Sequence, residues 1–225
     1  PDARHQPTGE RGGADVPRVA DEEMGEAQVQ LDGALGVAKL RSVIGGSLGG
    51  HQVLAWAALH PERTETVIAL ATSARLTSQA IAFDVVGRNA ILRDPHYAGG
   101  QYYENERKPA VGLALARMLG HITYLSQESM TTKFKPGPER PARDVASEFE
   151  RKFSVGSYLA HQGERFVERF DANSYMTLSM AMDLFDLGDN RERLQRSFAR
   201  SDCRFLIVSF SSDWLFPPFQ SREVV

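Results

Sequence analysis

The sequence predicts an α/β protein whose parallel sheet is interrupted by a long helical insertion. Two short apolar runs, at 40–44 and 66–71, flank a helix-like segment at 51–59, and a third apolar run returns at 204–210. Between 78 and 200 the sequence shows helical periodicity and no convincing strand. A strand, a helix and a strand in succession indicate a parallel βαβ unit, and helices cover both faces of such sheets.

Composition indicates a soluble globular protein. The 225 residues suffice for one sizeable domain or for one domain with a cap. The formal net charge of −3 gives no reason to propose nucleic acid or an anionic membrane as a partner. Cys203 is the single cysteine, which excludes an intramolecular disulfide and fits a reducing compartment. No apolar run reaches the roughly 18–20 residues of a membrane span, and the polar N-terminus lacks the apolar stretch of a signal peptide, so we expect a cytoplasmic protein.

The first part of the chain divides into an atypical N-terminus and the start of the core. Residues 1–17 are rich in glycine, proline and charge, and we expect them to be disordered or atypical. The segment 19–35 is loosely helical, and Gly36 stops it. Apolar residues recur in it every three or four positions: Met24, Ala27, Leu31 and Leu35. The predicted core comprises 18–77 together with 201–225.

Residues 78–200 form the predicted helical cap insertion. An apolar stripe repeats in it at helical spacing through Val111, Leu115, Met118, Ile122 and Leu125. Three prolines within 131–143 indicate a loop. Further along, Asp171 or Asn173 can cap a last helix.

A short glycine-rich motif carries the chemistry. The stretch GGSLG at 45–49 matches G-x-S-x-G, the nucleophile elbow of the α/β-hydrolase fold. The serine of an elbow lies at a sharp strand-to-helix turn, where Gly45 and Gly49 leave no side chains in the crowded space. Ser47 is therefore the candidate nucleophile, and the backbone N–H of Leu48 at the helix N-terminus is placed to stabilise an oxyanion. The alternative is a plain glycine-rich turn that binds phosphate, although the Rossmann and P-loop patterns are absent.

Asp213 is the candidate triad acid. It follows the apolar run at 204–210, and the chain order of this fold is serine, acid, histidine. The alternative is an Asx-turn residue that closes the strand. All six histidines, at positions 5, 51, 60, 96, 121 and 161, precede Asp213. An out-of-order histidine is a poor explanation, so the simpler interpretation is a chain truncated before the catalytic histidine.

Several stretches together resemble one family, homoserine O-acetyltransferase and its close acyltransferase relatives. These are VIGGSLGGHQVLAWA (43–57), ATSARLTSQAIAFDVVGRNAI (71–91), ARMLGHITYLSQESM (116–130), FVERFDANSYMTLSMAMD (166–183) and FLIVSFSSDWLFPPFQSREVV (205–225). The resemblance implies a partial α/β-hydrolase fold and a cytoplasmic enzyme of methionine biosynthesis. Such an enzyme moves an acetyl group, or a succinyl group in some relatives, from an acyl-CoA to the hydroxyl of L-homoserine through an acyl-serine.

The resemblance also assigns site residues. Ser47 looks like the nucleophile and Asp213 like the triad acid, while Arg117 looks like the arginine for the amino-acid carboxylate, with Tyr124 nearby. Arg117, His121 and Tyr124 are spaced to line one helix face, which by itself favours a solvated face with an interfacial tyrosine, and the resemblance reverses that preference. The family implies no metal and no cofactor, since acetyl-CoA is a co-substrate, and it implies a homodimer built through the helical insertion.

The sequence departs from the family in four places. The N-terminal strands with the second oxyanion donor are missing, and residues 1–17 look unrelated to the family. The segment with the catalytic histidine and a following aspartate is absent, and Phe219 stands where the family usually has a polar or acidic residue. We therefore expect a fragment that is inactive by itself and aggregates or folds only partly. A serine esterase of the same fold and a non-catalytic dimerising fragment are the alternative functions.

Overall fold

The computed structural model describes residues 20–134, 137 and 153–225, so the expectation for 1–17 lies outside the described residues. The described chain divides into two compact units. One unit contains the sheet and comprises residues 20–81 and 177–225, and the other is helical and comprises the described residues of 82–176. Helices α3 (Ser78–Leu92) and α8 (Ala172–Leu184) each contribute residues to both units.

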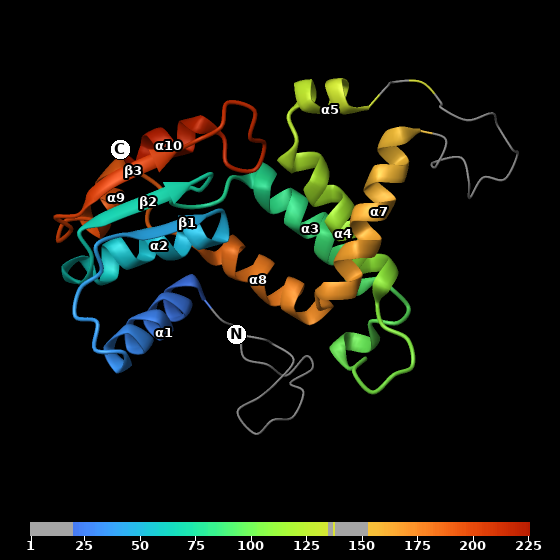
Figure 1. The fold of residues 1–225 in the computed structure, drawn as a ribbon, viewed down its shortest axis with the longest axis horizontal. Helices are drawn as coiled ribbons and strands as arrows, with labels where there is room; N and C mark the ends of the chain where they lie inside the picture. The colour runs from blue at the N-terminus through green and yellow to red at the C-terminus, as the bar shows by residue number, and fades with distance from the viewer. Residues whose placement is uncertain (1–19, 135–136, 138–152) are drawn as a thin grey trace, which may run out of the picture. The chain divides into compact units, whose positions relative to one another are not determined.

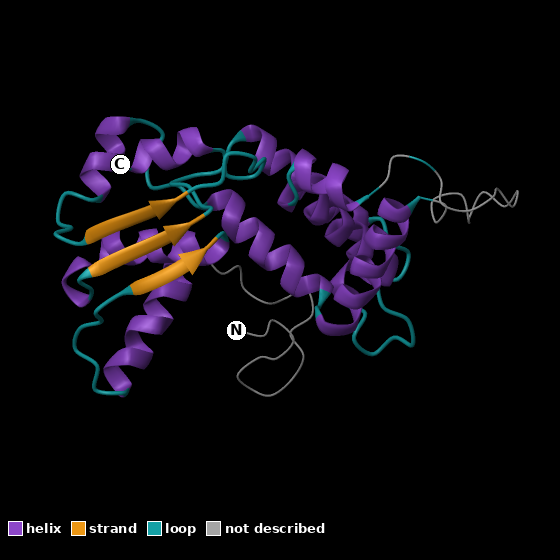
Figure 2. Ribbon diagram, turned by 45° about the horizontal axis from the view of Figure 1, so that its top comes forward, coloured by secondary structure: helices purple, strands orange, loops and turns teal. Residues whose placement is uncertain are grey.

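The sheet unit is built on three parallel strands, as the sequence predicts. Strands β1 (Val43–Gly46), β2 (Thr66–Leu70) and β3 (Arg204–Val208) lie in the order β1-β2-β3. The register sets Gly46 beside Leu70 and Leu70 beside Val208, so the three strands end at one level. All three arrows point the same way in Figure 2. Residues that follow the strands therefore emerge at one edge of the sheet.

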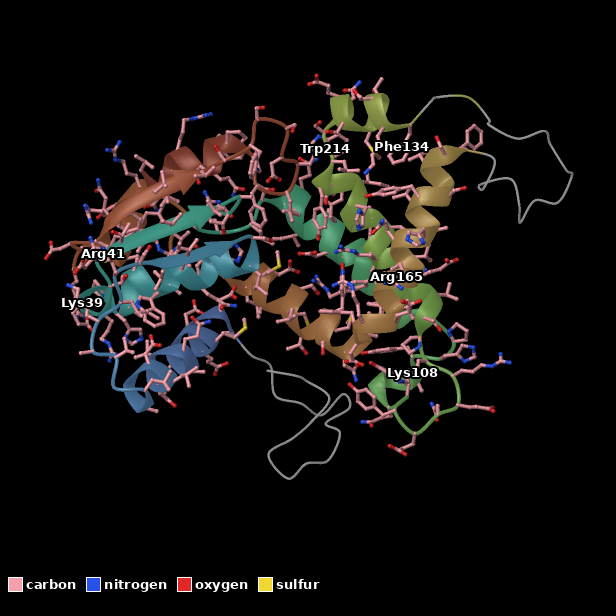
Figure 3. The ribbon with its side chains drawn as sticks, in the orientation of Figure 1. Lys39, Arg41, Lys108, Phe134, Arg165 and Trp214 are labelled. Atoms are coloured by element: carbon pink, nitrogen blue, oxygen red, sulfur yellow. The ribbon has the colours of Figure 1, made fainter. Side chains whose placement is uncertain are left out.

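The glycines of the motif belong to strand β1 itself. The predicted strand at 40–44 instead spans Val43–Gly46, because the backbone ladder needs no side chain and continues through both glycines. Leu40 makes only an isolated bridge to Thr64. Lys39 and Arg41 lie at the amino end of β1, where the strand has not yet begun (Figure 3).

Helix α2 (Leu48–Leu59) covers one face of the sheet (Figure 1). It starts three residues earlier than the predicted helix at 51–59, directly after Ser47. The buried core cluster comprises Val53, Leu54, Ala55, Ala57, Val67, Ala69 and Phe185. Complete burial of a side chain such as Leu54 contributes about 1.5–3 kcal/mol.

Helices from the end of the chain pack against the same core cluster. The first part of the sheet unit also includes the 3-10 turn η2 (Pro61–Arg63). Its last part contains the helices α9 (Arg191–Ser197) and α10 (Pro218–Val224). Phe198 and Val224 contact the cluster. On the alternate face of the strands, Ile44 is 63% and Leu206 is 51% exposed. The expectation of helices on both faces therefore holds for only one face within the described residues.

Helix α1 (Asp21–Ala34) confirms the predicted helix and its glycine stop. Gly36 has φ 74°, and Val37 N–H bonds to Asp32 C=O while Gly36 N–H bonds to Gly33 C=O. These two bonds form a Schellman C-cap. The predicted apolar spacing is misleading, however, because Met24 alone of the four apolar positions is buried, and Leu31 and Leu35 are 58% and 69% exposed.

The helical unit consists of packed helices and short turns. Its elements are α3, η3 (Ala98–Gly100), α4 (Ala110–Tyr124), α5 (Gln127–Lys133), α7 (Ser154–Arg169) and α8. Helix α4 packs on α3 through Gly112, where a Cβ would lie 2.4 Å from the Ala90 carbonyl oxygen. It packs on α7 where Gly163 meets Ala114. The helical character of this part of the chain agrees with the sequence.

Two details of the helical unit differ from the sequence analysis. The apolar stripe of α4 lies on an exposed side, since Val111, Leu115 and Ile122 are 66%, 48% and 37% exposed. The buried residues of α4 lie on another side of the helix and are Gly112, Leu113, Ala116 and Thr123. The expected loop at 131–143 begins later, since 131–133 complete α5, and most of its remainder lies outside the described residues.

None of the helices in the described part of the chain combines the length and the apolar content that a bilayer crossing requires.

Candidate active site

Ser47 has a strained backbone between β1 and α2. Its φ of 55° and ψ of −125° lie in a region that non-glycine residues rarely adopt. Ser47 N–H donates to the Leu70 carbonyl at 3.0 Å, and the Thr72 hydroxyl donates to the Ser47 carbonyl at 3.0 Å. Ala71, at the same edge, also has a positive φ of 45°. Such strain costs about 1–3 kcal/mol per residue and persists where the surroundings impose it, which is typical of functional sites.

Glycines next to Ser47 allow strand and helix to approach. A Cβ on Gly45 would lie 2.1 Å from the carbonyl oxygen of Gly49, and a Cβ on Gly50 would lie 2.5 Å from the Cβ of Thr72. Gly49 itself has nothing within 4 Å of its Cβ position. The expectation that Gly45 and Gly49 both relieve crowding is therefore correct for Gly45 and wrong for Gly49. The crowded position on the helix side is Gly50.

The N-terminus of α2 presents backbone donors beside the serine. Leu48 is the first residue of the helix, and Gly50 N–H and His51 N–H both bond to the Ser47 carbonyl, at 2.8 and 3.2 Å. Leu48 N–H has no hydrogen-bond partner among the described residues. A free N–H at the positive end of a helix suits a developing oxyanion.

Asp213 is held in the loop after β3 by one of its two carboxylate oxygens. Oδ1 accepts hydrogen bonds from Leu215 N–H at 2.9 Å and from Phe216 N–H at 2.8 Å, which is an Asx-turn geometry. Asp213 N–H also donates to the Phe210 carbonyl at 3.1 Å. The turn and the triad interpretations are compatible, because the turn engages Oδ1 and leaves Oδ2 to orient a base.

The structure brings Ser47, Leu48 and Asp213 to one edge of the sheet. The ladder continues past the strands through Ser47 N–H to Leu70 C=O and Ala71 N–H to Val208 C=O. Ser47 thus follows β1, and the loop with Asp213 follows β3, and these two strands lie two strand spacings or about 9.6 Å apart.

Histidines of the described chain are engaged elsewhere. His60 pairs with Glu26 at 3.0 Å, and His51 is fully buried with its Nδ1 3.3 Å from Asp21 Oδ2. His121 lies in the helical unit, where its Nδ1 is 2.9 Å from the Tyr158 hydroxyl. Within residues 20–134 and 153–225, no histidine side chain makes a hydrogen bond to Ser47 or Asp213, although the backbone N–H of His51 bonds to the Ser47 carbonyl.

Arg117 and Tyr124 share one face of α4 in the helical unit. The guanidinium carbon of Arg117 lies 5.6 Å from the centre of the Tyr124 ring and 4.8 Å from that of Phe166. Its Nε is buried without a hydrogen-bond partner in the described chain. His121 follows one turn later, and its pKa is lowered by burial and by the positive charges of Arg117, Lys133 and Arg169. The predicted common face of these side chains is confirmed, and it is cationic.

Two buried phenol sites in the helical unit have no clear signal in the sequence. Tyr102 and Tyr103 both donate to Asp171, at 2.7 and 3.0 Å, although about 70 residues separate the partners. Asp171 also accepts from Ser174 N–H at 3.0 Å, so the predicted cap of the last helix is confirmed. The hydroxyl of Tyr175 lies 2.7 Å from the Cβ position of Gly87, and burial, together with Asp84, raises the pKa of this phenol.

A strand, a strained serine and a helix N-terminus at the carboxyl edge of a parallel sheet define a nucleophile elbow. The family model described as alpha/beta hydrolase fold matches residues 6–225. The chain therefore belongs to the α/β-hydrolase-fold family.

Curated relatives confirm the resemblance to homoserine O-acetyltransferases. The bifunctional methionine biosynthesis protein MetXA/MetW of Rhodopirellula baltica is 59% identical over 97% of this chain and 35% of its own length. The homoserine O-acetyltransferase of Methanohalobium evestigatum is 47% identical over 100% of this chain and 45% of its own. The homoserine O-succinyltransferase of Ralstonia nicotianae is 44% identical over 100% of this chain and 56% of its own length. The chain thus spans about a third to just over half of the length of these relatives.

Solved structures agree on the fold. Homoserine O-acetyltransferase from Bacillus anthracis matches with a TM-score of 0.81 at 24% identity, over 98% of this chain and 59% of that one. Esterase E22 matches with a TM-score of 0.82 at 25% identity, over 98% of this chain and 60% of the esterase chain. Proteins described as a transferase and as an esterase therefore share this architecture.

Proposed function

We propose that the native gene product containing this chain transfers an acetyl group from acetyl-CoA to the hydroxyl of L-homoserine, a step of methionine biosynthesis. The observation that carries this proposal is the strained Ser47 at the carboxyl edge of the sheet, two strands from Asp213. The names of two curated relatives support homoserine as the acceptor, and the name of a third supports methionine biosynthesis as the pathway. No metal or cofactor takes part in the proposed chemistry.

The reaction runs in two displacements at Ser47. The serine Oγ attacks the thioester carbonyl, the C–S bond breaks, and coenzyme A leaves as the thiol with the serine proton. The homoserine hydroxyl then attacks the acyl-serine, its proton passes to the base, and O-acetylhomoserine leaves as Ser47 is restored. Each displacement passes through an oxyanion, for which Leu48 N–H is a donor, and removing one such donor costs about 10²–10³ in kcat.

The base in this proposal is a histidine oriented by Asp213 Oδ2. No histidine follows Asp213 in the 225 residues, so we propose that these residues expressed alone lack transferase activity. Loss of a triad member typically costs about 10³–10⁶ in kcat. Adding a segment that supplies a histidine after Asp213 should restore the rate.

Arg117 is the proposed contact for the carboxylate of homoserine. A guanidinium pairs with a carboxylate through two parallel hydrogen bonds, and the buried Nε of Arg117 has no protein partner in the described chain. Tyr124 lies over the same guanidinium and would limit its orientations. The cationic surroundings that lower the pKa of His121 also favour an anionic group here.

The proposed assembly is a homodimer in the cytoplasm, formed through the helical insertion. Helix α4 presents the exposed apolar side chains Val111, Leu115 and Ile122 in one row. Contiguous apolar surface of this kind marks interaction sites. Replacing Leu115 with lysine should shift the protein from dimer to monomer in sedimentation equilibrium.

The test compares acyl transfer with hydrolysis in the native gene product. Acetyl-CoA and succinyl-CoA are offered with L-homoserine or L-serine, and p-nitrophenyl acetate measures ester hydrolysis. The proposal expects transfer to homoserine from acetyl-CoA, and Arg117→Ala should raise KM for homoserine with a smaller effect on ester hydrolysis. The likeness to esterase E22 favours hydrolysis as the second candidate. Dominant hydrolysis, unchanged by Arg117→Ala, would overturn the transferase proposal.

A further inference from the structure

A buried carboxylate and imidazole pair lies within the sheet unit. Asp21 and His51 are both 0% exposed, and Asp21 Oδ2 lies 3.3 Å from His51 Nδ1. Asp21 is the first residue of α1, and His51 follows Ser47 by one turn on α2. The pair therefore ties the N-terminal helix to the helix that carries the nucleophile.

The two side chains depend on each other. Their oxygen and nitrogen atoms make no hydrogen bond within the described chain, so the 3.3 Å approach of Oδ2 to Nδ1 is the polar contact that the two side chains share. A lone charge in such a place would be strongly destabilising, whereas a pair is tolerated, and the N-terminus of α1 adds a favourable dipole for the carboxylate. Apolar residues could fill the same space without the cost of burying charge. A carboxyl group beside Nδ1 instead favours one orientation of the flat imidazole ring.

That orientation places the ring between two aromatic residues. His51 stacks on Phe185 at 4.3 Å between ring centres and 16° between planes, and it meets Phe216 edge-on at 5.7 Å and 83°. Phe216 N–H is one of the two donors that hold Oδ1 of Asp213. At its backbone, His51 N–H bonds to the carbonyl of Ser47. One residue thus contacts both the nucleophile turn and the loop of the candidate acid.

We propose that His51, oriented by Asp21, is a positioning residue that holds the Asp213 loop against the helix carrying Ser47. The inference rests on the proposed function of Ser47 and Asp213, because positioning matters only if these two groups act together. His51 does not touch the reacting atoms. It sets the distance between the nucleophile and the acid through Phe216.

The two tryptophans of the chain allow a test that needs no activity. Trp214 lies in the loop next to Asp213 and is labelled in Figure 3, while Trp56 is buried on α2. The native gene product is labelled with 5-fluorotryptophan, and the two resonances are assigned separately through Trp56→Phe and Trp214→Phe. Asp21→Asn should broaden or shift the Trp214 signal and leave that of Trp56 in place. The matched control is Leu54→Val, a fully buried change on α2 that lies in the core cluster and should leave Trp214 unchanged.

A double variant separates positioning from stability. Asp21→Leu combined with His51→Met removes both polar side chains and fills their space with apolar ones, so the fold should persist even if Asp21→Asn unfolds. Positioning predicts that kcat falls by about 10–10²-fold while KM changes little, because a displacement near 1 Å costs rates of that order. Wild-type kcat together with an unchanged Trp214 resonance in the double variant would overturn the inference.

Failure of the proposed function remains distinguishable from failure of this inference. If the wild-type protein transfers no acyl group, the labelling rate of Ser47 by a fluorophosphonate replaces kcat, and the Trp214 resonance is read as before. A slower labelling rate with a perturbed Trp214 supports the positioning by His51. An unchanged labelling rate with an unchanged Trp214 signal refutes it.

Discussion

Replacing Gly45 with alanine perturbs the nucleophile turn, and the same replacement at Gly49 is its matched control. A Cβ on Gly45 would lie 2.1 Å from the carbonyl oxygen of Gly49 and 2.8 Å from Cγ2 of Val53. Carbon and oxygen atoms in contact lie about 3.3 Å apart, so β1 and α2 must separate by about 1 Å. Overpacking of a core costs about 1–3 kcal/mol, and a clash against backbone belongs at the upper end. We expect Gly45→Ala to lower the free energy of unfolding by about 3 kcal/mol.

Gly49→Ala meets no atom within 4 Å and lies in a helix, where alanine is better than glycine by up to about 1 kcal/mol. Urea unfolding of the native gene product measures both variants, and fluorophosphonate labelling reports the geometry at Ser47. A displacement near 1 Å should slow labelling of Gly45→Ala by about 10²-fold, with Gly49→Ala near the wild-type rate. If Gly45→Ala behaves as wild type, or if both variants lose the same stability, the crowding argument is refuted.

Three further predictions concern single side chains. Asp213→Asn keeps the Oδ1 acceptor for two N–H groups but loses the charge. The free energy of unfolding in urea should therefore change little, while kcat should fall by about 10³–10⁴-fold. A kcat near that of the wild type would exclude Asp213 as the triad acid. Burial and nearby cations lower the pKa of His121, so the unfolded chain binds this proton more readily. The unfolding free energy should therefore fall as the pH drops from 7.5 through about 6.5, and His121→Gln should reduce that fall; an identical fall in the variant would contradict the assignment. Asp171→Ala removes the acceptor of two phenols, the buried Tyr102 and the partly buried Tyr103, and it also removes a helix cap. This should cost about 3 kcal/mol in urea unfolding, so a loss below about 1 kcal/mol would be inconsistent with this network.

Short sequence motifs predicted those parts of the fold that depend on steric contacts between residues close together in the sequence. The glycines around Ser47 permit a sharp turn between strand and helix, so the motif alone indicated the elbow and its nucleophile. The stop of α1 at Gly36 is another local effect, since glycine accepts the positive φ of the cap. Asp213 could be placed after β3 because parallel strands deliver their following residues to one edge of the sheet.

Other features depend on partners that are distant in sequence. The periodicity of α1 and α4 marks an apolar face, but the spacing does not say whether a neighbour covers it, and Leu31 and Val111 are exposed. The crowding at Gly50 arises from Thr72, which belongs to the segment after the next strand. Asp21 and His51 are thirty positions apart, and no motif signals a buried pair that forms only when α1 packs on α2. Spacing along the chain cannot supply such tertiary information.

Strand β2 is the only one of the three described strands with hydrogen-bonded neighbours on both sides. Both backbone groups of Ser47 are attached to this middle strand or to its immediate continuation, through the Leu70 carbonyl and the Thr72 hydroxyl. Amide protons of a doubly flanked strand exchange with solvent more slowly than those of outer strands, because they open only in larger unfolding events. The backbone of the nucleophile, at the end of β1, is thus anchored to the strand that is flanked on both sides among the three described strands. Local opening of the flanking described strands can therefore leave the backbone of the serine in place.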